Sequence, residues 1–148
     1  MATVDTVLSR KGYEVVTVPG RATVLEAAKL MNIWRVGAVV VAEQHGAGRR
    51  VEGIFTERDM LKRVVVEGRL PGEVLVSAVM TERVICCQPD TTVDEARTIF
   101  KTKRIRHLPV LGVDRKLHGL ISIGDLNAWA ISGQEAEIRY LKEYLYGA

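Results

Sequence analysis

Two neighbouring segments of the chain carry arginine, histidine, serine and aspartate side chains in a pattern that could bind an anion. Arg104, Arg106 and His107 lie on an apolar stretch that reads as a strand, and Ser122 and Asp125 follow after a charged turn. A serine three residues before an aspartate is typical of a helix N-terminus. The backbone N–H groups and the dipole of such a terminus favour an anion. The pattern therefore predicts a phosphate site near the start of that helix.

The same residues also have a purely structural explanation. Thr56-x-x-Asp59 and Ser122-x-x-Asp125 both have the form of a capping box, in which each side chain bonds a backbone N–H group of the other residue. A cap of this kind stabilises a protein by about 1 kcal/mol without any ligand. On a regular strand Arg106 and His107 would point to opposite faces, so one of them could line a cleft while the other does not. Both explanations remain open at this point.

Composition and charge indicate an ordinary globular protein. The chain has 148 residues, 47% of them hydrophobic, and a net charge of +3 with acids and bases interspersed. No apolar run approaches the roughly 20 residues that a membrane span requires, and the first residues lack a signal-peptide pattern. Cys86 and Cys87 are adjacent, which favours neither a disulfide between them nor a metal site. We therefore expect a cytoplasmic protein with no membrane segment and no metal.

An internal repeat organises the chain. Pro19 and Pro89 are 70 residues apart, and Asp59 and Asp125 are 66 apart. Each copy reads β-α-β-β-α, and a unit this small cannot bury its own apolar face, so the two copies should pack on each other. The strands are expected at 14–18, 36–41, 51–55, 83–88, 104–110 and 119–123, with a polar turn at 43–50, a helix from 125 to about 131, and a separate tail helix at 134–146.

This ordered set of motifs, present twice, resembles a tandem pair of cystathionine-β-synthase (CBS) domains, also called a Bateman module. The resemblance covers roughly residues 12–132. It implies an α+β fold in which two β-α-β-β-α repeats pack with pseudo-two-fold symmetry, flanked by N- and C-terminal helical segments. The expected organisation is repeat 1 at 12–66, a linker at 67–73, repeat 2 at 74–132, and a C-terminal helical extension at 133–148.

The resemblance also implies roles for individual residues in binding an adenosine nucleotide. In the second repeat Asp125 would accept hydrogen bonds from the ribose, Ser122 would lie near the phosphate, and Arg106 and His107 would donate to it. In the first repeat Thr56 and Asp59 match the motif. Gly37 and Ala38, however, stand where the family has its basic residue, so the first cleft would be empty, bind a nucleoside-like group, or borrow a cation such as Arg58. The second cleft is therefore expected to be the better site.

The implied function is that of a regulatory, energy-sensing module with no catalytic activity and no required cofactor. Its expected ligand is AMP or ATP, with NAD(H) and S-adenosylmethionine as alternatives, and its expected assembly is a homodimer acting on an unidentified protein. No hydrolase, metalloprotease, P-loop or dinucleotide-binding motif occurs in the sequence. Two rival hypotheses remain. One is a ligand-independent dimeric scaffold that docks through the tail; the other, which the mixed charges disfavour, is nucleic-acid binding through the arginine-bearing strands.

Overall fold

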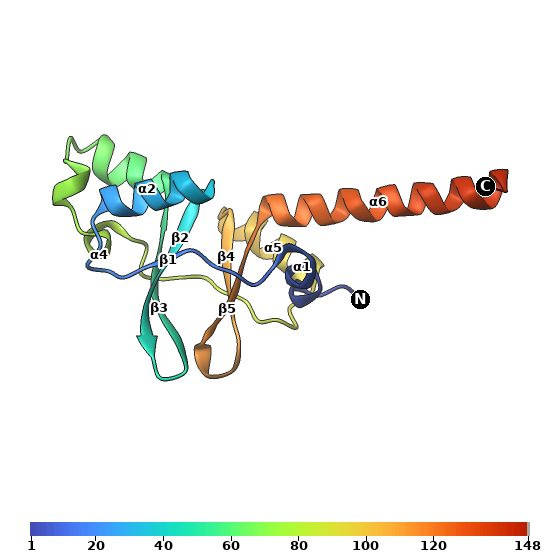
Figure 1. The fold of residues 1–148 in the computed structure, drawn as a ribbon, viewed down its shortest axis with the longest axis horizontal. Helices are drawn as coiled ribbons and strands as arrows, with labels where there is room; N and C mark the ends of the chain where they lie inside the picture. Colours follow the sequence, from blue (N-terminus) through green and yellow to red (C-terminus); the bar gives the residue numbers. More distant parts are fainter. Residues whose placement is uncertain (148) are drawn as a thin grey trace.

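The computed structural model describes residues 1–147, and for residues 134–136 it describes the backbone alone. The chain forms two similar halves, each built around a β-hairpin, and the two hairpins lie side by side (Figure 1). The α+β class is confirmed. In chain order the elements are α1 (Val4–Lys11), β1 (Thr17–Val18), α2 (Val24–Trp34), β2 (Ala38–His45), β3 (Gly48–Thr56), α3 (Glu57–Met60), the π-helical turn η1 (Leu61–Val65), the 3₁₀ turn η2 (Pro71–Glu73), α4 (Val76–Val79), α5 (Val93–Lys103), β4 (His107–Leu111), the 3₁₀ turn η3 (Val113–Arg115), β5 (Leu117–Ser122) and α6 (Ile123–Tyr146).

The backbone reproduces the sequence repeat at the ends of the paired helices. α2 begins at a capping box on Thr23 and α5 at one on Thr92, and both N-cap residues are extended. The two helices also end alike, because Arg35 and Arg104 are both C-cap residues in the left-handed conformation with φ of 53°. A non-glycine residue rarely adopts this conformation, so its presence at both positions shows that each helix enters the following strand through the same turn.

The strands form a three-stranded sheet in the first half and a two-stranded sheet in the second. β1 pairs in parallel with β2, β2 pairs antiparallel with β3, and β4 pairs antiparallel with β5. The strand expected at 83–88 is wrong as an element, because that segment makes one isolated parallel bridge, from Cys87 to Val110. The hairpin turn expected at 43–50 is shorter, since the strands continue to His45 and resume at Gly48.

Each half has its own hydrophobic core, and each core takes in a segment from outside its own hairpin unit. The first core includes Val74, Val76 and Val79, which follow the linker. The second core includes Val4, Val7 and Leu8 of α1 together with residues from Cys87 to Leu126. The N-terminal helix thus completes the second half, while the segment around α4 completes the first. In Figure 1, α1 accordingly lies beside α5 and the start of α6.

Two glycines on the returning strands allow these added segments to pack closely. A Cβ atom on Gly53 would lie 2.6 Å from Met80 Sδ and 2.8 Å from the Thr81 carbonyl oxygen. A Cβ atom on Gly119 would lie 2.7 Å from a methyl carbon of Leu8. A side chain at Gly53 would therefore collide with backbone, whereas one at Gly119 would require the Leu8 side chain to shift, and the close approach itself recurs in the two halves.

The C-terminal helix is one continuous element. A helix ending near Ile131 and a separate tail helix were expected, but α6 runs without a break from Ile123 to Tyr146. Its first turns contact α1 and α5, and the remainder extends away from the body of the molecule (Figure 1). The side chains of Ile138, Leu141 and Leu145 are at least half exposed. Among the described residues, no helix is long and apolar enough to cross a membrane.

Candidate functional site

A cavity of about 320 Å³ lies at the junction of the two halves and is lined by both of them. We call it the inter-repeat cavity. From the first half come the end of β3, the start of α3 and Gly37; from the second half comes the segment that leads into β4. Its lining residues are Gly37, Ile54, Thr56, Glu57, Arg58, Asp59, Thr81, Arg104, Ile105, Arg106 and His107.

Asp59 is the only buried charged residue among the side chains that the structure describes, with 8% of its surface exposed. One carboxylate oxygen, Oδ2, accepts hydrogen bonds from the backbone N–H and the hydroxyl of Thr56, at 3.0 and 3.2 Å. The other, Oδ1, accepts from the Thr81 hydroxyl at 3.2 Å and lies 3.9 Å from Arg63 Nε. These bonds fix the orientation of the carboxylate at the cavity wall. The carboxylate has about four acceptor positions, of which these bonds use three, and rotation of the Thr56 hydroxyl frees a second position for ligand hydroxyls.

The cations of the cavity come chiefly from the second half. Arg104 and Arg106 line the cavity, Arg58 joins them from the first half, and all three side chains are exposed. His107 is half-buried, and burial lowers its pKa from the ordinary value of 6.5. The charges of Lys11 and Arg106 act in the same direction, whereas Asp125 and Glu57 partly offset them. At neutral pH the arginines therefore carry the positive charge, and His107 is a neutral hydrogen-bonding group.

The structure adds a second set of neighbours to the basic residues of the second repeat. Arg106 and His107 lie next to the start of α6, as expected, since His107 pairs with Ser122 and the Arg106 carbonyl oxygen accepts from Ile123 N at 3.1 Å. Both also line the cavity that contains Thr56 and Asp59. The first repeat, which has Gly37 and Ala38 where the second has Arg106 and His107, thus places its Thr56/Asp59 motif in one cavity with these two residues. The packing of the two halves thus brings arginines of the second repeat to the motif of the first.

Of the candidates Gly37, Ala38 and Ser122, only Gly37 lines the inter-repeat cavity. Gly37 lines the inter-repeat cavity, and its carbonyl oxygen accepts a hydrogen bond from Glu57 N at 3.1 Å. Ala38 is buried in β2 and does not line the cavity. Ser122 is the cross-strand partner of His107 but also lies outside the cavity lining.

Asp125 is engaged by a lysine from the N-terminal helix. Lys11 Nζ lies 2.5 Å from Asp125 Oδ2 and donates to the Leu120 carbonyl oxygen at 2.6 Å. The same carboxylate oxygen accepts from Ser122 N at 2.8 Å, which completes a capping box at the start of α6. The second motif therefore has a structural role as a helix cap, and its carboxylate already has a cationic partner.

Sequence reasoning overlooked Lys11 and Thr81, although a signal for them was present. The two residues are 70 positions apart, the same separation as Pro19 and Pro89. Each contacts the aspartate of one motif, Thr81 through a hydroxyl and Lys11 through an ammonium group. Extending the repeat back into the residues before each first strand would have identified both. The two motifs consequently differ in charge, because equivalent positions carry a neutral group in one half and a cation in the other.

Comparisons with known proteins agree with this architecture. A family model of the CBS domain matches residues 4–66 and 76–131. The mitochondrial CBS domain-containing protein CBSX3 of Arabidopsis thaliana is 36% identical over 127 residues, which are 84% of this chain and 61% of the relative. The chain thus spans less than two thirds of that relative. The crystal structure of the CBS-domain containing protein ATU1752 from Agrobacterium tumefaciens is 40% identical, with a TM-score of 0.78, covering 87% of this chain and 99% of that one.

More distant structures share the fold and were solved with adenosine-containing ligands. The CBS domain protein PAE2072 from Pyrobaculum aerophilum, complexed with AMP, is 24% identical with a TM-score of 0.74, covering 83% of this chain and 88% of that one. The CBS domain pair of protein MJ0100, in complex with 5′-methylthioadenosine and S-adenosyl-L-methionine, is 21% identical with a TM-score of 0.76. The match covers 90% of this chain and 98% of that one. At these identities the likeness concerns the fold.

Proposed function

Because the chain belongs to the CBS-domain family, we propose that it is a regulatory module that binds an adenosine nucleotide in the inter-repeat cavity. One observation carries the proposal. The buried carboxylate of Asp59 in the first repeat shares one cavity with Arg104, Arg106 and His107 of the second repeat. A carboxylate suits ribose hydroxyls, and arginines suit phosphate, since they are always charged and can bind it bidentately.

The chemistry of the cavity favours a phosphorylated ligand. Ile54 and Ile105 give it apolar walls for an adenine ring, and Asp59 would accept from the ribose. The arginines would hold the phosphate, with His107 as a neutral donor or acceptor beside them. AMP and ATP fit this arrangement, and NAD(H) is an alternative that carries phosphates as well. S-adenosylmethionine is disfavoured, because it has no phosphate and brings a sulfonium cation toward the arginines.

A ligand at this position would act on the packing of the two repeats. The residues that would hold the ribose and those that would hold the phosphate belong to different halves, so binding would favour the arrangement in which both contact the ligand. An as yet unidentified protein would bind the module differently in this arrangement than in the ligand-free one. We propose that the module works by binding and carries out no reaction of its own. We also propose repeats at 12–66 and 74–132, joined by the linker 67–73, and a location in the cytoplasm.

The rival proposal is a ligand-independent scaffold, and one observation favours it. α6 extends away from the body with Ile138, Leu141, Leu145, Tyr140 and Tyr144 exposed along it. Exposed apolar and aromatic side chains gathered on one element are characteristic of protein contacts. A homodimer would be part of either proposal. The two differ in whether a nucleotide changes the behaviour of the protein.

A thermal-shift screen separates the two proposals. The protein is heated with AMP, ATP, NAD or S-adenosylmethionine, and Arg106→Ala is measured beside the wild type. A ligand at about 100 times its dissociation constant adds roughly 2.7 kcal/mol to the free energy of unfolding. For a chain of this size that raises the Tm by about 5–10 °C. We expect such a shift with AMP or ATP and its loss in Arg106→Ala. No shift with any of the four would overturn the sensor proposal, and loss of homodimerisation on removal of residues 134–148 would then support the scaffold.

A further inference from the structure

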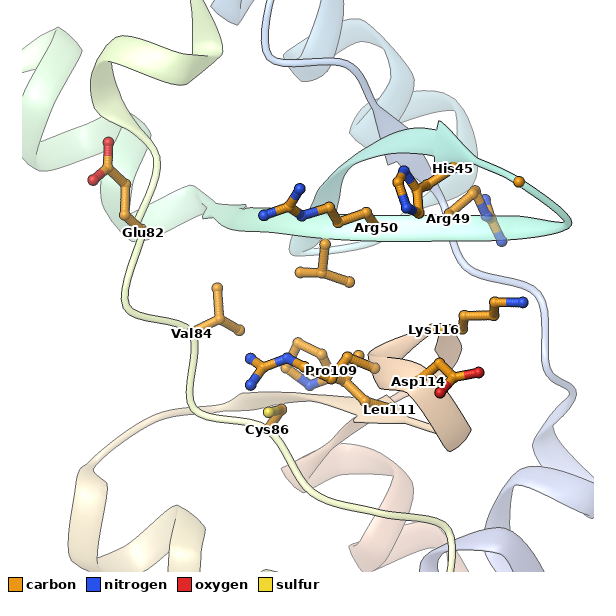
Figure 2. Close-up of a pocket in the computed structure, with 13 residues that line it drawn as sticks. His45, Arg49, Arg50, Glu82, Val84, Cys86, Pro109, Leu111, Asp114 and Lys116 are labelled. Carbon is orange, nitrogen blue, oxygen red and sulfur yellow. The ribbon is translucent and has the colours of Figure 1, made fainter.

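A second and larger cavity lies between the turn ends of the two hairpins. It measures about 650 Å³ and shares no lining residue with the inter-repeat cavity. Figure 2 shows the β2–β3 hairpin on one side, the β4–β5 hairpin on the other, and Glu82, Val84 and Cys86 of the connecting segment closing one end. We call it the hairpin cavity. Its size is within the range of pockets that hold small molecules.

The rim of the hairpin cavity is positively charged. Arg49, Arg50, Arg115 and Lys116 line it, against the carboxylates of Glu82 and Asp114. Arg49 donates to the Thr17 hydroxyl at 3.0 Å. Within the part of the chain that the structure describes, the ion pairs and side-chain hydrogen bonds involve neither Arg50 nor Arg115 nor Lys116. Three exposed cations therefore line one cavity, and among the described residues none of them has an ion-pair partner.

The inner wall of the hairpin cavity is apolar. Val51, Val84, Pro109 and Leu111 contribute to it, and the last two are buried. A ligand that filled this space would therefore need an apolar or planar body as well as negative charge. A bare polyphosphate has the charge to engage the basic rim by itself, while leaving the apolar wall uncovered.

The two turns are held together and in an unusual backbone conformation. The aliphatic stem of Lys116 lies against Gly48, where an added Cβ atom would come within 2.7 Å of Lys116 Cδ. A backbone bridge also joins Arg50 to Lys116 across the two hairpins. In the β4–β5 turn, Asp114 and Arg115 both have left-handed backbone angles, with φ of 61° and 60°. Such angles are costly for consecutive non-glycine residues, and they recur at ligand sites where a turn must aim its side chains.

From this arrangement we propose that the hairpin cavity binds a phosphorylated small molecule with at least two negative charges and an apolar body. Arg50 and Arg115, one from each hairpin, hold the phosphates, and the apolar wall receives the body of the ligand. The proposal is independent of the nucleotide proposed for the inter-repeat cavity, because the two share no residue. Binding of an extended nucleic acid is the alternative that the test must distinguish, since a cavity bounded by two hairpins and the connecting segment suits a compact ligand better than a strand.

The test measures whether tripolyphosphate protects Cys86, whose thiol lines the hairpin cavity. The rate of alkylation by the uncharged reagent N-ethylmaleimide is followed by mass spectrometry, with sodium chloride at matched ionic strength as the control. Cys87 is a poor competitor, because it is buried and burial raises its pKa to about 12. Isothermal titration with tripolyphosphate gives the dissociation constant independently, so the result does not rest on thiol reactivity alone.

Three proteins are compared: the wild type, Arg50→Ala/Arg115→Ala, and Arg106→Ala, which alters only the inter-repeat cavity. Each charge-assisted contact to phosphate contributes roughly tenfold to affinity, so the double variant should bind about 100-fold more weakly. We expect protection of Cys86 in the wild type and in Arg106→Ala, and its loss in the double variant. The double variant should fold normally, since both arginines are exposed. Absence of both protection and binding heat in the wild type overturns the proposal. So does protection that depends on Arg106 alone, or binding of a single-stranded oligonucleotide without any of tripolyphosphate.

Discussion

The two aspartates of the repeated motif provide a matched test of which cleft binds the nucleotide. Asp59 and Asp125 both complete a capping box at the start of a helix, so replacing either with alanine removes the same structural interaction. They differ in their surroundings. Asp59 lines the inter-repeat cavity, whereas Asp125 lies outside that lining and is paired with Lys11. We predict that Asp59→Ala strongly weakens AMP binding and that Asp125→Ala does not.

The expected magnitudes follow from these contacts. Loss of a cap should cost about 1 kcal/mol in either variant. With an unfolding entropy of about 2.1 cal/mol/K per residue, that lowers the Tm by about 3 °C for this chain. Asp59→Ala also removes an acceptor for two ribose hydroxyls, and hydrogen bonds to a charged group are worth about 1.5–3 kcal/mol each. The dissociation constant should therefore rise at least about 100-fold.

Thermal denaturation with and without AMP measures both effects together. At an AMP concentration that stabilises the wild type by about 2.7 kcal/mol, Asp59→Ala should retain only about 0.4 kcal/mol, or roughly 1 °C. Asp125→Ala should start from a lower Tm but keep the full shift of about 5–10 °C. The reasoning is refuted if the shift disappears in Asp125→Ala and persists in Asp59→Ala. That result would return the site to the second cleft, as the sequence alone suggested.

Three further predictions concern stability. Lys11→Met removes a partly exposed ion pair worth about 0–1 kcal/mol, so the Tm should fall by no more than about 3 °C, and a larger fall would contradict this low value. His107 has a pKa lowered mainly by burial, so its contribution to the free energy of unfolding is constant above pH 6.5 and the protein loses stability as the pH drops below that value. In thermal denaturation between about pH 7.5 and 5, His107→Gln should therefore show a smaller fall in Tm than the wild type. Gly53→Ala should cost about 1–3 kcal/mol in chemical denaturation, because its Cβ would lie 2.8 Å from the Thr81 carbonyl oxygen. Gly133→Ala, with open space around it in α6, should instead stabilise by up to about 1 kcal/mol, and equal effects of the two would contradict the close packing at Gly53.

Features that depend on neighbouring residues could be predicted from the sequence. The capping boxes at Thr23, Thr92, Thr56 and Ser122 follow from spacings of three residues, and all four are present. The hairpins follow from apolar runs separated by turn residues. The repeat itself is a comparison of the chain with its own later part. These local signals were sufficient for the α+β class and for the CBS family.

Contacts between distant residues could not be predicted in the same way. Whether Arg106 faces Asp125 or Asp59 depends on how the halves pack, and no local period encodes that packing. The pairing of Lys11 with Asp125 joins positions 114 residues apart. The strand expected at 83–88 is not formed, for a related reason. Its residues suit a strand, but only Cys87 reaches a partner strand, so tertiary packing decided the outcome.

The exchange of helices between the two cores has a consequence for how the chain is made. The first core contains residues from Val18 to Val79, so it can close once about half of the chain has been synthesised. The second core needs Val4, Val7 and Leu8, which precede every residue of the first core in the chain, together with residues as late as Leu126. Domains generally fold as units during synthesis, from the N-terminal end onward. The apolar face of α1 therefore stays unburied during synthesis until the chain has been translated as far as Leu126.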